Sequence, residues 1–169
     1  MAISMYSASV PVFVQLLGGL KTVLQKAEAH ATEQKWDMGY VLGMRLFPDM
    51  FPLERQVRQV CNHALSAARV AGVTLPSFPD ADGSFAEMQS RIDKTIDCLK
   101  SITPAQLDGK EDTSITIPVG GNPREFKAQN YVFHFAMLQV GFHTTTAYNI
   151  IRSVGVVIGK RDYLGQMPS

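Results

Sequence analysis

Apolar residues recur along most of this chain at spacings of three and four, which is the period of an amphipathic helix. Four stretches follow this pattern, over residues 10–33, 49–72, 84–99 and 128–153. Each stretch predicts a long helix with one face packed in a core. The apolar face of the fourth helix is expected at Tyr131, Phe135, Leu138, Phe142, Ala147, Ile150 and Ile151.

Residues at the ends of these stretches are typical of helix caps. Asp49 is expected to cap the second helix, with Pro52 in its first turn, where the missing N–H of proline costs nothing. Ser84 and Glu87 have the Ser-x-x-Glu spacing of a capping box at the start of the third helix. A short helical piece is expected between the first two long helices, with Asp37 as its N-cap.

Residues 114–127 depart from the helical period. The segment Ser-Ile-Thr-Ile-Pro at 114–118 alternates polar and apolar side chains, and Gly120-Gly121 tolerates the positive φ of a tight turn. This pattern predicts a β-hairpin, which must lie against the helices because two strands alone are unstable in water. The tail at 156–169 shows neither period and is expected to be extended or irregular.

These elements predict an all-α fold, a four-helix bundle with a small β-hairpin before the last helix, in one domain over residues 1–169. The 169 residues are 46% hydrophobic and 18% charged, so the chain can bury a core without disulfides or metal. Cys61 and Cys98 form no Cys-x-x-Cys pair. They are expected to be buried, reduced thiols of a cytoplasmic protein.

Net charge and hydropathy argue against two classes of partner. The formal net charge is +1, from 16 Lys and Arg against 15 Asp and Glu, which creates no basic field for nucleic acid. No apolar run approaches the ~20 residues that a membrane span requires. Residues 1–11 lack the pattern of a signal peptide. We therefore expect a cytoplasmic protein with neither a nucleic-acid nor a membrane partner.

Candidate chemistry lies in polar residues inside the helical stretches, because bundles build their sites from side chains that point into the core. Gln139 and His143 are one turn apart on the last helix and point at one spot, while His63 stands in a mostly apolar column of the second helix with Gln56. His63, Gln139 and His143 could bind a divalent metal or activate a water molecule. In the alternative, the histidines are core or rim residues paired with a carbonyl or with a threonine from Thr144 to Thr146. His134 is expected to face elsewhere.

Three segments resemble a bacterial domain family of unknown function. They are Ser-Met-Tyr-Ser-Ala-Ser-Val-Pro-Val-Phe at 4–13, Arg-Leu-Phe-Pro-Asp-Met-Phe-Pro-Leu at 45–53, and Phe-His-Thr-Thr-Thr-Ala-Tyr-Asn-Ile-Ile-Arg at 142–152, the last followed by Gly-Lys-Arg-Asp-Tyr-Leu-Gly at 159–165. That family is similar in outline to the DinB/YfiT-like superfamily of metalloenzymes. The resemblance covers nearly the whole chain.

The resemblance implies an up-down-down-up four-helix bundle that is often a homodimer and binds Ni or Zn through three histidines. One of these lies on the second helix, where His63 matches it, and two form His-x-x-x-His on the last helix. His143 matches the second of that pair, but Gln139 replaces the first. Because an amide oxygen is a poorer ligand than imidazole, the metal site is expected to be weak, altered or lost.

Two hypotheses follow for function. In the first, the protein is a DinB-like, metal-dependent enzyme that acts on a small molecule through a cleft at His63, Gln139 and His143. In the second, it is a non-catalytic dimeric bundle with a small-ligand pocket and no metal. No residue motif identifies a substrate, a reaction or a catalytic residue.

Overall fold

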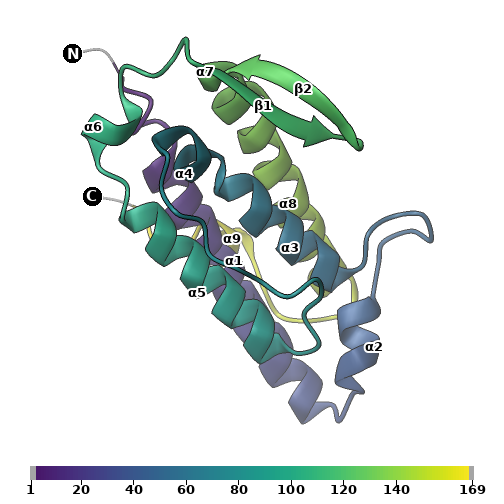
Figure 1. The fold of residues 1–169 in the computed structure, drawn as a ribbon. Helices are drawn as coiled ribbons and strands as arrows, with labels where there is room; N and C mark the ends of the chain where they lie inside the picture. The colour runs from purple at the N-terminus through teal and green to yellow at the C-terminus, as the bar shows by residue number, and fades with distance from the viewer. Residues whose placement is uncertain (1–2, 168–169) are drawn as a thin grey trace.

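A computed structural model of the chain describes residues 3–167 as a mostly helical fold with one two-stranded antiparallel sheet (Figure 1). The two strands are β1 (Ser114–Val119) and β2 (Asn122–Lys127). The helices are α1 (Val10–Glu33), α2 (Met38–Gly43), α3 (Leu53–Ala64), α4 (Ser66–Ala71), α5 (Phe85–Lys100), α6 (Pro104–Leu107), α7 (Ala128–Asn130), α8 (Met137–Ser153) and α9 (Lys160–Leu164), with a π-helical segment, η1 (Tyr131–Ala136), between α7 and α8.

The four longest helices enclose the core. α1 packs against α5 and α8, and α3 packs against α8 and α5. Figure 1 shows the hairpin and α2 at opposite ends of these helices. The predicted first and third helices are confirmed, since the apolar stripes of α1 and α5 are buried. Large side chains with almost no exposure include Phe13, Leu17, Leu20, Leu24, Leu53, Phe85, Met88, Ile92 and Leu99.

The second predicted helix starts later than expected and is divided. Asp49 does not cap it, because α3 begins at Leu53 and its N-cap is Pro52 in an extended conformation (φ −67°, ψ 165°). The Leu53 N–H donates to the Met44 carbonyl (2.8 Å), which closes residues 44–52 into a loop. Leu65 then separates α3 from α4. This loop matters below because it carries Phe51 to the candidate site.

Other predicted caps and the hairpin are confirmed. The carboxylate of Asp37 accepts the Tyr40 N–H (2.7 Å), and the Ser84 hydroxyl accepts the Glu87 N–H (3.2 Å). Glu87 accepts the N–H of Gly83 instead of that of Ser84, so the capping box is only half formed. In the hairpin, Gly120 and Gly121 have φ of 59° and 84°, which a type I′ turn requires. The hairpin packs on the core through the half-buried Ile115, Ile117 and Phe126.

The last predicted helix forms, but its apolar face was partly wrong. Leu138 is 66% exposed and Phe142 is 56% exposed, whereas Val140, His143 and Thr144 are buried. The π-helical segment η1 accounts for the difference. Its i→i+5 turns hold more residues than α-helical turns, so a stripe drawn at α-helical spacing from the buried Tyr131, the first residue of η1, has rotated toward solvent by Leu138.

Two smaller expectations also change. The tail was expected to be irregular, but α9 forms there and packs against α1, with the carboxylate of Asp162 accepting the Gly159 N–H (2.9 Å). Cys61 is buried as expected, while Cys98 is only half-buried. No helix within residues 3–167 is long and apolar enough to cross a membrane.

Candidate functional site

Two of the predicted site residues meet where α3 packs against α8. His63 lies near the end of α3 and His143 in the middle of α8. Their ring centroids are 5.9 Å apart and their planes differ by only 4°, so the rings form a loose parallel stack. We refer to these two residues as the histidine pair. His143 is 6% exposed, and His63 is half-buried.

A hydrogen bond sets the orientation and tautomer of His143. Its Nδ1 lies 2.7 Å from Oε1 of Gln56, in a buried contact between α8 and α3. The Nε2 amide of Gln56 donates to the backbone carbonyl of Phe51 (2.9 Å), so Oε1 is the atom turned toward the ring. Since an amide oxygen can only accept, Nδ1 of His143 carries the proton. The Nε2 atom of the neutral ring then keeps its lone pair.

Burial keeps both rings neutral at physiological pH. Desolvation lowers the pKa of His143 to about 4. Desolvation also lowers the pKa of His63 to about 4, and the positive charges of a protonated His143 and of Arg69 act in the same direction. Neutral imidazoles are the form that binds metal ions or accepts a proton. The pair is therefore available for either kind of chemistry.

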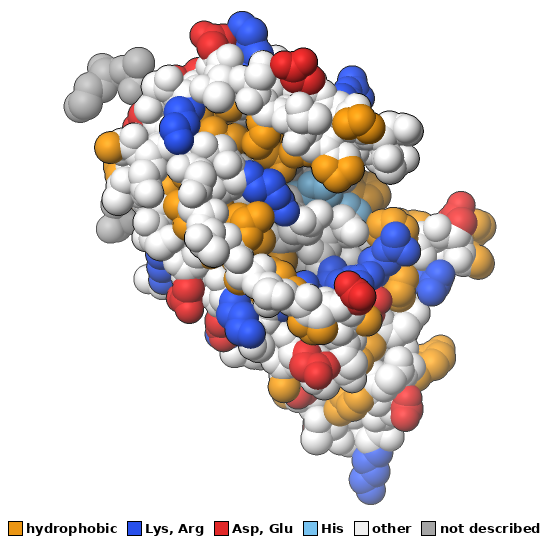
Figure 2. Space-filling view, viewed as in Figure 1, with side chains coloured by type: hydrophobic (Ala, Val, Ile, Leu, Met, Phe, Trp, Pro, Cys, Tyr) orange, Lys and Arg blue, Asp and Glu red, His pale blue; other side chains and the backbone are white. Residues whose placement is uncertain are grey.

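Aromatic side chains line the histidine pair. The ring of Phe51 lies parallel to His143 with centroids 6.3 Å apart, and Phe142 meets His143 edge-on at 5.2 Å. On the other ring, Phe135 meets His63 edge-on at 5.5 Å. Phe135 belongs to the π-helical segment η1, a kind of irregularity frequent at functional sites. Figure 2 shows a histidine side chain in a hollow of the surface, among hydrophobic, Lys and Arg side chains.

The third predicted residue is placed less favourably. Gln139 lies one turn before His143 on α8 and is half-buried, but among residues 3–167 its side chain forms no hydrogen bond with either histidine. His134 is exposed and lines another pocket with Arg124 and Phe126, whose lining includes neither histidine of the pair. His143 does pair with a carbonyl oxygen, which is one feature of the alternative, but this oxygen is Oε1 of the Gln56 side chain.

Two members of the site were not identified from sequence. Gln56 stands two turns before His63 in the same helical column, and that spacing was a signal that it faces the same neighbour. Phe51 had no comparable signal, because it lies in a loop whose course depends on tertiary contacts.

The histidine pair meets two requirements of a metal site. The two rings are close enough to share one ion, and one of them, His143, is held in a fixed orientation. A zinc–nitrogen bond of about 2.0–2.1 Å puts an ion roughly 3 Å from a ring centre, so two imidazoles on one ion have centres up to about 6 Å apart. Gln56 holds His143 in the way that outer-shell partners hold ligating histidines. Because an ion lies in the plane of the imidazole that binds it, one of the two stacked rings has to turn before both bind the same ion. Gln139 would be a weak third donor.

Among residues 3–167, no larger set of ligands competes with this pair. Within the described residues, no group of three or more His, Cys, Asp or Glu side chains is arranged to hold a metal ion. An ion at this site would therefore have two imidazole ligands and several positions open to water or substrate.

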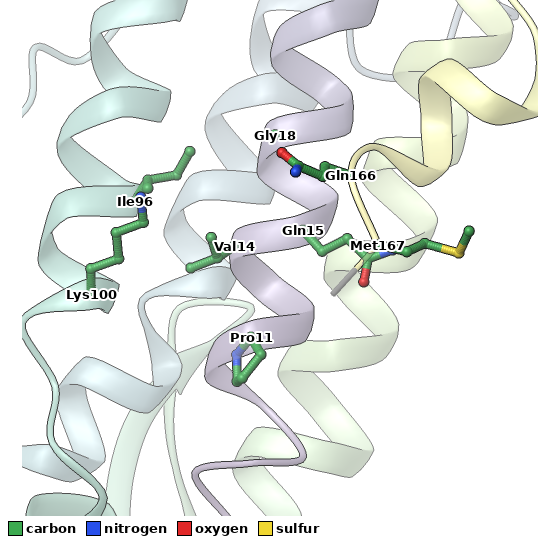
Figure 3. A pocket seen from close by; sticks show the side chains of 8 residues that line it. All are labelled: Pro11, Val14, Gln15, Gly18, Ile96, Lys100, Gln166 and Met167. Carbon is green, nitrogen blue, oxygen red and sulfur yellow. The ribbon is translucent and has the colours of Figure 1, made fainter. Parts of the chain in front are cut away.

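A separate pocket lies away from the histidine pair. Its volume is about 540 Å³, and it lies between α1, α5 and the segment Gln166–Met167 (Figure 3). Among the described residues that line it, Lys100 is the single titratable side chain. With no carboxylate, histidine or thiol in its wall, this pocket does not compete as a catalytic site.

Comparisons with known proteins agree with this architecture. A family described as "Domain of unknown function (DUF1993)" matches residues 5–164. Among solved structures, the chain is similar to the crystal structure of a DinB family member protein from Shewanella denitrificans at 1.83 Å resolution. The two are 34% identical, with a TM-score of 0.88 over 98% of this chain and 94% of that chain. No curated protein matches the chain.

Proposed function

Since this chain belongs to the DUF1993 family and is a DinB-like protein, we propose that it is a metal-dependent enzyme acting on a small molecule at the histidine pair. In this proposal α1, α3, α5 and α8 are the helices of an up-down-down-up four-helix bundle, with the site between α3 and α8. The observation that carries the proposal is the bond from His143 Nδ1 to Gln56, which leaves a neutral His143 with its Nε2 lone pair free.

Each side chain has a distinct part in the proposed site. His63 and His143 would hold the ion, and Gln139 would add an amide oxygen if its side chain turned toward them. A bound divalent ion would supply Lewis acidity and lower the pKa of a bound water molecule. Gln56 orients His143, while Phe51 packs on His143 and Phe135 packs on His63.

Metal binding by untagged protein tests the proposal. We expect purified protein, stripped with EDTA and titrated with Zn²⁺ or Ni²⁺ in a calorimeter, to bind one ion per chain. His143→Ala should weaken binding at least about tenfold, since it removes one of the two imidazole ligands. His134→Ala removes an exposed histidine of the same helical region and should leave the affinity unchanged.

The replacement at position 139 offers a gain-of-binding test. Gln139→His restores His-x-x-x-His on α8 and should raise Zn²⁺ affinity about tenfold or more, because imidazole is a better ligand than an amide for this ion. An unchanged affinity would mean that position 139 does not face the ion.

A second candidate function is a metal-free ligand pocket in a dimeric bundle. Two observations favour it: the parallel stacking of His63 on His143, and the lack of a hydrogen bond from Gln139 to either ring among residues 3–167. Under this candidate, the titration detects no stoichiometric ion, and His143→Ala and His134→Ala behave alike. That result would remove the metal-dependent enzyme.

A further inference from the structure

One pocket of the molecule is rich in arginine. It has a volume of about 400 Å³ and lies between the outer face of α3 and α4 and the loop that precedes α5. Four arginine side chains line it, against a single carboxylate, that of Asp80. We call it the arginine pocket and define it by Arg55, Arg58, Arg69 and Arg91.

Two of these arginines are neutralised by carboxylates. Arg91 is buried, and its Nε and Nη2 donate to Asp82 at 2.7 and 3.0 Å. Arg58 pairs with Glu54, with Nε and Oε2 3.4 Å apart. These two ion pairs shape the wall of the pocket but leave little charge for a ligand.

Arg55 and Arg69 are different, because neither forms an ion pair with a carboxylate among residues 3–167. Arg69 is half-buried and is held in place by Asn62: Nη1 donates to its backbone carbonyl and Nη2 to Oδ1, both at 2.8 Å. Arg55 is exposed and lies over the ring of Phe51, 3.7 Å from its centroid. The guanidinium groups are thus positioned by neutral partners and keep their full charge.

Each of these two arginines is linked to one histidine of the pair by aromatic rings. Arg55 lies on Phe51, which is parallel to His143. Arg69 Nη1 lies 3.4 Å from the hydroxyl of Tyr131, a residue whose ring stacks on Phe135. Phe135 in turn meets His63. The arginine pocket is therefore connected to the histidine pair through one aromatic ring on the Arg55 side and through two on the Arg69 side.

We propose that the arginine pocket binds a small molecule through its oxyanion groups, carboxylate or phosphate, with Arg55 and Arg69 each recognising one such group. That the rest of this molecule reacts at the histidine pair rests on the proposed function. The planar fork of a guanidinium matches two oxygens of either group, and pairing with a charged oxygen is about twice as strong as a neutral hydrogen bond.

The size and charge of the site favour a small ligand over a polymer. A volume of about 400 Å³ lies in the range of roughly 300–1,000 Å³ typical of small-molecule pockets. The net charge of the whole chain is only +1, which gives no extended field for a nucleic acid. The positive charge is local and matches one or two negative groups.

Calorimetric titration of the EDTA-treated, full-length protein with inorganic phosphate and, separately, with malonate tests the proposal. At low ionic strength we expect at least one anion to bind with a Kd of about 10 mM or tighter. Arg55→Gln and Arg69→Gln should each weaken binding at least about threefold, and the double variant about tenfold or more. Preference for phosphate or for malonate identifies the recognised group.

The matched control is Arg124→Gln in the hairpin. Arg124 also lies over an aromatic ring, that of Phe126 at 5.3 Å, but it is outside the arginine pocket. The Arg124→Gln variant should bind the anion within about twofold of the wild-type affinity. Arg69→Lys keeps the charge but loses the fork, and a partial loss of binding is expected from it. Circular dichroism checks that each variant is folded, and the exposed Arg55 provides a test independent of the packing around Arg69.

Three results would overturn the proposal: no binding of either anion below about 50 mM, unchanged binding by the Arg55→Gln/Arg69→Gln variant, or an equal loss in Arg124→Gln. The test stands apart from metal binding. His143→Ala should still bind the anion within about twofold, so failure of the metal titration and failure of anion binding are separate outcomes.

Discussion

Acidification is expected to destabilise this protein through the histidine pair. The pKa of His143 is about 4 in the folded protein and 6.5 as its ordinary value, which applies to the unfolded chain. The unfolded state therefore binds more protons between these two values. The contribution of His143 to stability is fully present above its pKa in the unfolded chain. It is lost as the pH falls toward its pKa in the folded protein.

The magnitude follows from the same values. Between about pH 7.5 and about pH 5.5, an unfolded histidine takes up its proton while a folded one with a pKa of about 4 does not, which costs about 1.4 kcal/mol of unfolding free energy. The pKa of His63 is also lowered to about 4, but this residue is half-buried, so solvent screening reduces its share of the loss. Together the pair should cost between about 1.4 and 3 kcal/mol over this range.

Urea unfolding of EDTA-treated protein at the two pH values measures this loss. His143→Gln is the informative variant, because its amide can still donate to Gln56 but does not titrate. It should reduce the loss on acidification by about 1.4 kcal/mol, whatever its stability at neutral pH. His134→Gln should behave as the wild type. A loss below about 0.5 kcal/mol in the wild type, or an equal loss in His143→Gln, would refute the reasoning.

Two further predictions use neighbouring residues as controls. Gly19→Ala should destabilise the protein by about 1–3 kcal/mol, because a Cβ at this position would collide with the backbone of α9. A Cβ at position 18 meets open space, so Gly18→Ala should stabilise the protein by about 0.5–1 kcal/mol. Thermal unfolding measures both changes. Gln56→Met leaves the buried Nδ1–H of His143 without an acceptor and should cost about 1–3 kcal/mol in urea unfolding. Gln59→Met on the same helix should stay within about 0.5 kcal/mol, and equal costs would contradict the assigned role of Gln56.

The parts of the fold that sequence predicted well are those governed by local chemistry. α1 and α5 follow their apolar period, Asp37 and Ser84 accept the backbone N–H groups that their spacing indicates, and Gly120-Gly121 forms the hairpin turn. In each case the interacting groups lie within a few residues of one another, so the local sequence pattern is enough to predict the contact.

The errors occur where a distant contact decides a local conformation. Asp49 has the chemistry of a cap, but an extended Pro52 and the bond from Leu53 to Met44 start the helix later. The short α9 forms against a glycine of α1 that is about 140 positions away in the chain, which no local pattern describes. The exposed Leu138 follows from the π-helical turns that precede it.

For the candidate site, the amino-acid sequence alone showed which residue types are available. His63, Gln139 and His143 stand out because few polar side chains interrupt the helical stripes. Tertiary structure decided how they are used. It stacks His63 on His143, leaves Gln139 without a bond to either ring among residues 3–167, and provides Gln56 from the facing helix.

The same division applies to the arginine pocket. Arg55 and Arg69 are two of many charged residues in a chain whose net charge is only +1, and nothing in their spacing marks them as a pair. Folding places both in the lining of one pocket, with Arg55 on Phe51 and Arg69 beside Tyr131. Helical period follows from interactions between near neighbours, so sequence determines it. A site joins side chains from separate elements, and their positions are fixed only when those elements pack.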